Sequence, residues 1–236
     1  MNLFLDAFAW LFDSANFSGS TGVAYRLGEH LMITVFVVAL SACIALPVGI
    51  MVGHTGRGRT AVVMIAGAAR AIPTLGLLTL LGLMLGIGLK APILALVILA
   101  IPSLLAGAYA GVESVPPMTV DSARAVGMNR WQVITRVELP LGAPVIVGGI
   151  RAATLQVVAT ATLAAYTADF GLGRYIFAGL KTGDYAQMLG GALLVTALAL
   201  VLELLLALAQ RTAHRLATPT MTAENEPSVT TMNGIS

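Results

Sequence analysis

Charged side chains are scarce in this sequence. Asp, Glu, Lys and Arg make up 10% of its 236 residues, whereas hydrophobic residues make up 58% and the mean hydropathy is +0.90. Soluble globular domains contain about 25% charged residues, so this chain lacks the polar surface that a water-soluble fold requires. The scarcity of charge therefore excludes an ordinary soluble domain and favours a lipid bilayer as the solvent.

Three further features are lacking. The single cysteine, Cys43, excludes a disulfide within the chain. A net charge of +2 without a basic stripe gives no reason to expect nucleic acid as a partner. The sequence also contains no GxxxxGK[ST] loop, the motif that cradles nucleotide phosphates. We therefore expect no enzymatic ATP chemistry, no metal site and no cofactor bound by this chain.

Long apolar runs are what the sequence has instead. A helix needs about 20 apolar residues to cross the hydrocarbon core of a bilayer. Five stretches meet this requirement, at 31–53, 71–89 (extended backwards through 61–69), 91–112, about 145–168 and about 187–209. The sequence therefore predicts an all-α, polytopic membrane protein with about five transmembrane helices.

Three regions divide the chain. Residues 1–24 begin with an apolar segment interrupted by Asp6 and Asp13, which favours an amphipathic helix lying at the membrane interface. Residues 25–216 hold the apolar stretches and form the predicted transmembrane domain. Residues 217–236 are polar and without periodicity, so we expect a disordered tail.

Lysine and arginine are distributed unequally between the two sides of a five-span chain. One side carries Arg57, Arg59, Arg124, Arg130, Arg136, Arg211 and Arg215, and the other carries Arg26, Lys90, Arg174 and Lys181. Cytoplasmic loops of membrane proteins carry the excess of positive charge. The bias predicts that residues 113–143 and the C-terminus are cytoplasmic and that the N-terminus lies outside.

A polar segment, 113–140, separates two of the apolar stretches. Pro116-Pro117 ends the preceding helix, Thr119 is a candidate N-cap, and Gly127 is a candidate terminator of a helix of about two turns. So short a helix is marginal in water, so it requires packing against something else. From the residues alone, a solvated hairpin on the membrane surface and a contact site for a partner are both open.

A second short helix is expected after this one. Asn129 and Gln132 have the spacing of a capping box, and Leu139-Pro140 is the expected end of the helix at the membrane. Further along, Arg151 lies in an apolar stretch, where it is expected either to extend towards the interface or to pair with Glu138 or Glu203.

This polar segment resembles the cytoplasmic loop of permease subunits of ATP-binding-cassette importers. Their pattern is Glu-Ala-Ala, three residues, Gly, nine residues and Ile-x-Leu-Pro. Here Asp121-Ser122-Ala123, Gly127 and Val137-Glu138-Leu139-Pro140 keep every spacing, with Asp for Glu, Ser for Ala and Val for Ile.

Other stretches are similar to permeases that import glycine betaine, choline, carnitine and related osmoprotectants. They are Ala71–Leu78, Gly148–Thr154 and Thr162–Leu180, and the similarity covers about 25–215. Where that subfamily usually has Gly-Ala-Gly-Gly-Leu-Gly, this chain has Ala168-Asp169-Phe170-Gly171-Leu172-Gly173, a departure that concerns the solute and not the fold.

The resemblance implies a type I importer permease fold in a bacterial plasma (inner) membrane. It implies three protein partners: a separate ATPase that binds ATP and Mg, a second permease subunit, identical or paralogous, and an extracytoplasmic substrate-binding protein. It assigns ATPase coupling to Val120, Asp121, Ser122, Ala123, Arg124, Gly127, Leu139 and Pro140.

Two sets of residues, one near the pathway or its outer mouth and one in an outer loop, are candidates for contact with solute or binding protein. A quaternary ammonium ion is attracted to aromatic faces, so Tyr109, Tyr166, Phe170 and Tyr175 are candidates for the substrate pathway, with packing as the ordinary alternative. The loop residues Asp169, Arg174 and Lys181 are candidates for docking of the binding protein, or are simply solvated.

Two other functions stay open at this point. A permease of the same class for an amino acid or another small polar solute has the same loop. An ion-coupled secondary transporter is the alternative of a different class, although the apolar stretches hold no acidic pair at mid-membrane depth and the polar segment would then have no evident purpose.

Overall fold

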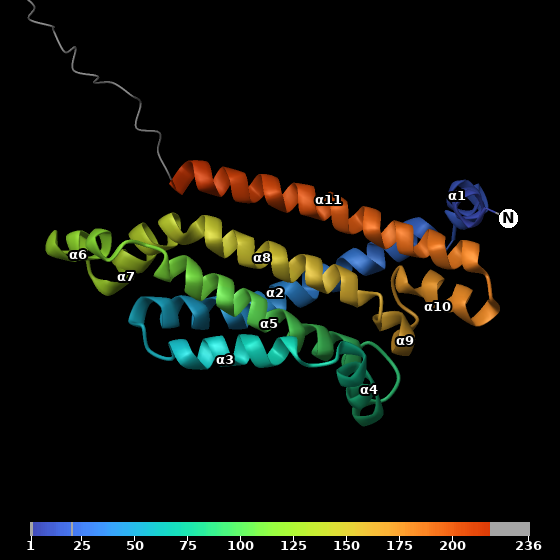
Figure 1. The fold of residues 1–236 in the computed structure, drawn as a ribbon, viewed down its shortest axis with the longest axis horizontal. Coiled ribbons are helices and arrows are strands. Elements are labelled where there is room, and N and C mark those ends of the chain that lie inside the picture. The colour runs from blue at the N-terminus through green and yellow to red at the C-terminus, as the bar shows by residue number, and fades with distance from the viewer. Residues whose placement is uncertain (1, 20, 218–236) are drawn as a thin grey trace, which may run out of the picture.

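The structure, a computed structural model, describes residues 2–19 and 21–217, and every regular element in this part of the chain is a helix. Four long segments lie side by side in a bundle (Figure 1). They are α2 (Val23–Thr55), α5 (Lys90–Glu113), the continuous run Arg130–Ala161 that includes α8 (Leu139–Ala161), and α11 (Tyr185–Ala217). Each is long and apolar enough to cross a membrane, which confirms the predicted polytopic all-α class.

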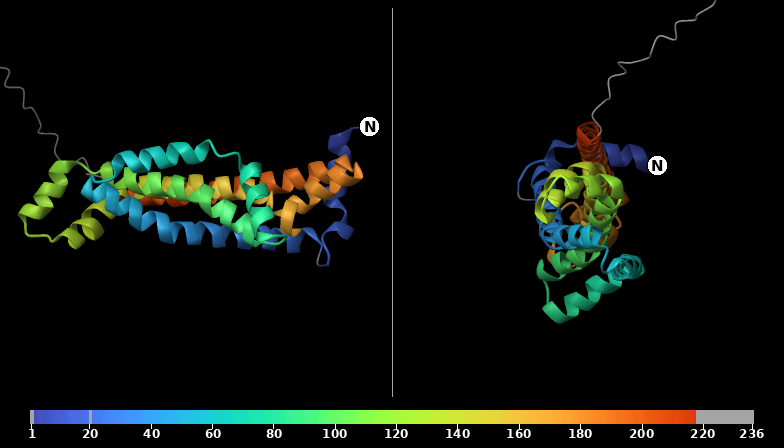
Figure 2. Two further views of the ribbon diagram at one scale, coloured as in Figure 1. Left: turned by 90° about the horizontal axis from the view of Figure 1, so that it is seen from below. Right: turned by 90° about the vertical axis from the view of Figure 1, so that its left-hand side faces the viewer.

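Short helices gather at the two ends of the bundle. One end carries α6 (Pro117–Ala125) and α7 (Arg130–Val133) and is called the α6 end; Figure 2 shows this hairpin projecting beyond the long helices. The opposite end, called the α10 end, carries α1 (Leu3–Phe12), η1 (Ser14–Asn16), α9 (Ala164–Ala168) and α10 (Gly173–Thr182). The larger predicted group of basic residues lies towards the α6 end, where α2 and α11 also end, and the smaller group lies towards the α10 end.

The second predicted span is not one straight helix. It consists of α3 (Arg59–Arg70) and α4 (Thr74–Leu85), which meet at an angle of 87°. Pro73, in an extended conformation, precedes α4 and cannot continue the hydrogen-bonded ladder of α3. With 12 residues, α4 is about 18 Å long and too short to cross a bilayer alone. The bundle therefore has four long spans, or five if the bent pair counts as one.

The fourth span also differs from its prediction. Leu139-Pro140 does not end the helix that begins at Arg130, because a π-helical segment, η2 (Ile134–Glu138), joins α7 to α8 without a break. Pro140 has no amide hydrogen to donate, and it lies directly after the π-helical turn, where the spacing of the backbone hydrogen bonds changes. Helix α7 is thus continuous with a helix that is long and apolar enough to cross a membrane.

Helix α5 forms the centre of the bundle. In its most apolar window 61% of the residues are buried, against 11–28% in the other three long spans. The backbones of α5 and α8 touch at facing glycines. A Cβ at Gly107 would meet the Cα of Gly149 at 2.6 Å, and a Cβ at Gly111 would meet the carbonyl oxygen of Gly142 at 2.9 Å. Small residues permit such close approach of membrane helices.

The outer faces of α2 and α11 remain apolar and exposed. On α11 the exposed side chains are Leu200, Val201, Leu204, Leu205 and Leu208. A continuous apolar face of this kind suits lipid or another membrane-embedded subunit.

The predicted terminal regions have different outcomes. Helix α1 forms within residues 1–24 and packs on α11, with Phe4, Leu5, Phe8 and Phe12 exposed; its location at a membrane interface stays a prediction. Ala217 is the last residue of α11, and the tail predicted at 217–236 otherwise lies outside the described residues.

Candidate functional site

The α6 end contains the predicted coupling segment as a folded, exposed helix. Helix α6 begins at Pro117 with Pro116 as its N-cap, so the predicted N-cap at Thr119 is wrong. Proline fixes φ at a helical value and needs no donor at the first position, and this pre-organises the start three residues earlier. The nine residues of α6 extend about 13 Å.

Gly127 ends this helical segment as predicted. Its φ is +90°, in the left-handed region, and the amide of Met128 donates to the carbonyl of Ala123 at 3.1 Å. No atom lies within 4 Å of a Cβ built at Gly127. The requirement for glycine therefore comes from the backbone conformation and not from lack of space.

The predicted coupling residues do not all face the same surroundings. Asp121, Ser122 and Arg124 are exposed, Val120 is half-buried and Ala123 is buried. Leu139 and Pro140 belong to the first turn of α8, away from α6 along the helix.

Three apolar side chains of this end are exposed although they lie outside the long spans. Met118 is 79%, Val126 is 77% and Trp131 is 69% accessible. Sequence analysis did not assign Met118 and Trp131 to the coupling site. Exposed apolar groups on a polar segment are a usual mark of a protein contact.

The second short helix is capped as predicted. The backbone amide of Gln132 donates to the side chain of Asn129 at 2.9 Å, and the amide of Asn129 donates to Gln132 Oε1 at 2.8 Å. This reciprocal cap fixes the angle at which α7 leaves the Gly127 turn.

A buried polar pair, missed by sequence analysis, joins this loop to α2. His54 Nδ1 lies 2.7 and 2.9 Å from the two carboxylate oxygens of Glu138, and the two side chains are 3% and 4% exposed. Glu138 is the last residue of the π-helical segment. The only signal in the sequence was a carboxylate directly before Leu-Pro at the start of an apolar stretch.

A basic cavity lies beside this pair. Its volume is about 340 Å³, and its lining residues are His54, Thr55, Arg57, Arg124 and Arg130. Three guanidinium groups around one hollow favour an anionic occupant, because guanidinium binds carboxylate and phosphate through paired hydrogen bonds.

Between two of the long helices, Arg151 of α8 pairs with Glu203 of α11, and both side chains are partly exposed. Arg151 Nε donates to a carboxylate oxygen of Glu203 at 2.7 Å, and another guanidinium nitrogen donates to Gln210 Oε1 at 2.9 Å. Of the predicted alternatives, the pair with Glu203 is confirmed, whereas Glu138 pairs with His54 instead.

At the α10 end, two of the three predicted docking residues lie together. Arg174 pairs with Asp169, which has a positive φ of 50° and whose carbonyl accepts a hydrogen bond from Arg26 at 2.8 Å. Lys181 is exposed in the last turn of α10. Their docking role stays a prediction.

The four aromatic pathway candidates do not form one cluster. Tyr109 is buried towards the α6 end with Ala45 and Leu105, and Phe170 packs against a core that includes Val37. Tyr166 is 56% exposed, with its ring centroid 5.8 Å from that of Phe177. Tyr175 is buried at the α10 end. Their contact with solute stays a prediction.

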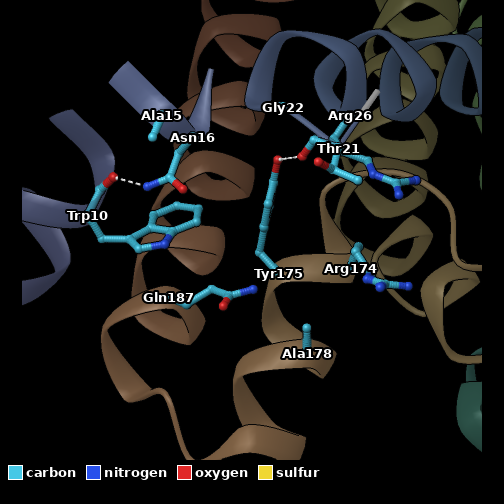
Figure 3. A pocket seen from close by; sticks show the side chains of 10 residues that line it. All are labelled: Trp10, Ala15, Asn16, Thr21, Gly22, Arg26, Arg174, Tyr175, Ala178 and Gln187. Atoms are coloured by element: carbon cyan, nitrogen blue, oxygen red, sulfur yellow. Dashed lines mark hydrogen bonds between the residues drawn. The ribbon is translucent and has the colours of Figure 1, made fainter. Parts of the chain in front are cut away.

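Tyr175 lines a second cavity, shown in Figure 3, of about 250 Å³. The other lining residues are Trp10, Ala15, Asn16, Thr21, Gly22, Arg26, Arg174, Ala178 and Gln187. The Tyr175 hydroxyl donates to the carbonyl of Thr21 at 2.6 Å. Burial of the ring raises the pKa of this phenol above its ordinary value, so the hydroxyl keeps its proton for this bond at neutral pH.

The described part of the chain contains no cluster of potential metal ligands. Within residues 2–19 and 21–217, no group of three or more His, Cys, Asp or Glu side chains could hold a metal ion.

Comparison with known proteins gives one family. The family described as "Binding-protein-dependent transport system inner membrane component" matches residues 45–216. The glycine betaine/carnitine/choline transport system permease protein OpuCB of Bacillus subtilis is 34% identical over 79% of this chain and 86% of its own length. The carnitine transport permease protein OpuCB of Listeria monocytogenes is 37% identical over 74% of this chain and 80% of its own length.

Solved structures show the same fold. The MetNI methionine ABC transporter in an inward-facing conformation has a TM-score of 0.70 at 22% identity, covering 81% of this chain and 95% of the other. An amino acid ABC transporter gives a TM-score of 0.60 at 18% identity, covering 79% of this chain and 93% of the other. These likenesses show the type I importer permease fold, and at such identities they say nothing of the solute.

Proposed function

The chain belongs to the family of binding-protein-dependent transport system inner membrane components, and we propose that it is the permease subunit of an ATP-driven importer of an osmoprotectant such as glycine betaine, choline or carnitine. The observation that carries this proposal is the 34% identity, over 79% of the chain, to a permease protein of a glycine betaine/carnitine/choline transport system. Relatives named for choline or carnitine transport at 34% and 37% identity support the same solute class.

The α6 end is the proposed coupling site. A separate ATPase, which holds ATP and Mg, would receive α6 in a groove, with Met118 and Val126 supplying apolar contact and Asp121 and Arg124 supplying polar contact. Acidic side chains of that ATPase are the occupants that suit the basic cavity lined by Arg57, Arg124 and Arg130. A second permease subunit, of the same or a paralogous sequence, would complete the pathway.

The structure offers a route by which movement of α6 would reach the spans. Helix α7, η2 and α8 form one continuous run, and the His54–Glu138 pair ties this run to α2. Each of the two permease subunits would have its own ATPase. When ATP draws these two ATPases together, force on α6 would tilt α8 and α2 as a unit. Near-rigid movement of helix groups around a fixed path is the usual form of alternating access.

The orientation follows from the same proposal. The α6 end and the C-terminal end of α11 would be cytoplasmic, and the α10 end would face the binding protein outside. The excess of arginine at the α6 end supports this placement.

Reconstitution tests the proposal directly. The permease is purified with its ATPase and binding protein, placed in liposomes, and assayed for ATP-dependent uptake of labelled glycine betaine, choline and carnitine, with a panel of amino acids as comparison. Uptake of at least one quaternary ammonium, dependent on ATP hydrolysis, is expected. Uptake of amino acids alone would contradict an osmoprotectant as the solute and would indicate an amino-acid permease. Transport by this chain without any ATPase would overturn the importer assignment.

A further inference from the structure

The cavity at the α10 end has a wall of two aromatic side chains. Trp10 of α1 and Tyr175 of α10 meet edge to face, with ring centroids 5.1 Å apart (Figure 3). Asn16 Nδ2 donates to the carbonyl of Trp10 at 2.8 Å and holds the end of α1 in place. The wall is thus assembled from segments more than 150 residues apart in the chain.

Two adjacent glycines of α11, Gly190 and Gly191, let these two aromatic side chains pack directly against the helix backbone. A Cβ at Gly190 would meet the indole of Trp10 at 2.5 Å, and a Cβ at Gly191 would meet the Cβ of Tyr175 at 2.7 Å. Any larger residue at either position would displace one of the rings. The position of both aromatic groups is therefore set by the backbone of a long helix.

The same cavity has a cationic side. Arg26 is 7% exposed, and one of its terminal nitrogens donates to Glu29 and to the carbonyl of Asp169, each at 2.8 Å. Its Nε is buried and has no hydrogen-bond partner among the described residues. Arg174 lines the cavity beside it and pairs with Asp169.

The aromatic and cationic side chains that line this cavity point to a particular ligand chemistry. A carboxylate would be attracted to the guanidinium of Arg174, which lines the cavity and is 45% exposed. A quaternary ammonium makes no hydrogen bonds and is attracted to aromatic faces such as those of Trp10 and Tyr175. The two arginines are balanced by Glu29 and Asp169, so a ligand without net charge disturbs this balance least.

We propose that this cavity binds a small zwitterion that carries both a carboxylate and a quaternary ammonium group. The proposal rests on the osmoprotectant function proposed above and makes it specific: a betaine-type solute occupies this site at the outer end of the permease. The volume of about 250 Å³ is below the range of about 300–1,000 Å³ for drug-sized ligands and suits so small a solute. Choline, which lacks the carboxylate, would make no charge-assisted contact with Arg174.

Equilibrium binding of labelled glycine betaine and labelled choline to the intact importer in nanodiscs, without its binding protein, tests this proposal. The variants are Trp10→Leu and Arg174→Gln. Tyr185→Leu and Lys90→Gln serve as matched controls, since both residues are exposed near the same end and neither lines the cavity. Arg26 is left intact because its bonds to Glu29 and Asp169 also hold the fold together.

Trp10→Leu is expected to weaken glycine betaine binding about tenfold, because it removes the aromatic face. Choline is expected to bind about tenfold more weakly than glycine betaine, and Arg174→Gln to reduce that preference, because it removes a charge-assisted contact. The two control variants should bind as the unchanged importer does. Fluorescence of Trp10 reports whether the ligand is at this cavity. The Trp10 signal is the difference between the Trp131→Phe variant and the Trp10→Phe, Trp131→Phe double variant. Quenching of this signal by glycine betaine places the ligand at the cavity.

The result that overturns the proposal is glycine betaine binding that is absent, or is unchanged in Trp10→Leu and Arg174→Gln. In that case the cavity residues serve only to anchor α1 on α10 and α11. Uptake by the unchanged importer separates the two proposals. If glycine betaine is still transported, the cavity proposal fails alone, and if no quaternary ammonium is transported, the proposed function fails with it.

Discussion

The imidazole of His54 and the carboxylate of Glu138 form a buried pair at 2.7 Å, although 84 residues separate them in the chain. The pair lies where the loop that carries α6 enters the membrane-spanning run. It joins α2 to the continuous run Arg130–Ala161 at the level of the π-helical turn. Any force that moves α6 therefore acts on two spans.

His54→Leu should destabilise the permease, because it leaves the Glu138 carboxylate buried and unpaired. Loss of one partner of a buried pair costs about 3–5 kcal/mol. The His54→Leu, Glu138→Leu double variant should lose less, since no uncompensated charge remains. Thermal unfolding of the purified complex measures both, with Arg59→Gln as control, because its pair with Glu113 is 66% and 40% exposed and is worth about 0–1 kcal/mol. Equal losses in the single and double variants would show that the pair does not act as a unit.

Gly127→Ala should uncouple ATP hydrolysis from uptake while leaving insertion intact. An alanine at φ +90° is strained by about 1–3 kcal/mol, and relief of that strain would swing α6 away from α7. Gly183→Ala is the matched control, because Gly183 also has a positive φ of 75° and open space around it but lies at the opposite end. Uptake per ATP hydrolysed should fall severalfold in the first variant and not in the second. An unchanged ratio in Gly127→Ala would contradict the coupling role of this turn.

Asp121→Arg should weaken attachment of the ATPase. The side chain is 74% exposed and its pair with Arg124 is long, at 3.6 Å, so the fold itself loses about 0–1 kcal/mol. The reversed charge would add repulsion to the cluster of Arg57, Arg124 and Arg130 and to any cationic group of the partner. Co-purification of the ATPase is expected to drop for Asp121→Arg and to persist for Asp121→Asn. Full retention of the ATPase by Asp121→Arg, with normal uptake, would remove Asp121 from the coupling surface.

Gly107→Ala should destabilise the contact between α5 and α8. The new methyl group would meet the Cα of Gly149 at 2.6 Å, and overpacking of this kind costs about 1–3 kcal/mol. Gly67→Ala, on α3 with nothing within 4 Å, should instead be neutral or stabilise by up to about 1 kcal/mol, since alanine favours helix over glycine. The yield of monodisperse protein and its unfolding midpoint distinguish the two. A stable Gly107→Ala protein would mean that α5 and α8 separate at little cost.

Arg151→Glu should be rescued by Glu203→Arg. The single variant places two carboxylates together between α8 and α11, where unpaired charge within a span costs up to about 3 kcal/mol. The double variant restores opposite charges across the same contact. Expression and unfolding midpoint should fall in each single variant and recover in the double variant. Failure of the double variant to recover would indicate that Gln210, which also bonds Arg151 at 2.9 Å, makes the geometry specific to arginine.

The sequence by itself determined the helical class, the long spans and the capped turns of the polar loop. These features depend on local properties: the length of an apolar run, a glycine with positive φ at position 127, and the three-residue spacing of Asn129 and Gln132. The start of α6 was misplaced by three residues because a proline pair can end one helix and begin the next.

Only the tertiary structure decided which distant groups meet. Packing sets the bend of 87° between α3 and α4. Segments far apart in sequence meet in the pairs of His54 with Glu138 and Arg151 with Glu203. They also meet at the cavity lined by Trp10 and Arg26. A charged residue within an apolar stretch requires a partner when it is buried, but the sequence pattern does not say which residue that partner is. Its identity is fixed when helices such as α5 and α8 approach at their glycines and set which faces of the remaining helices lie opposite one another.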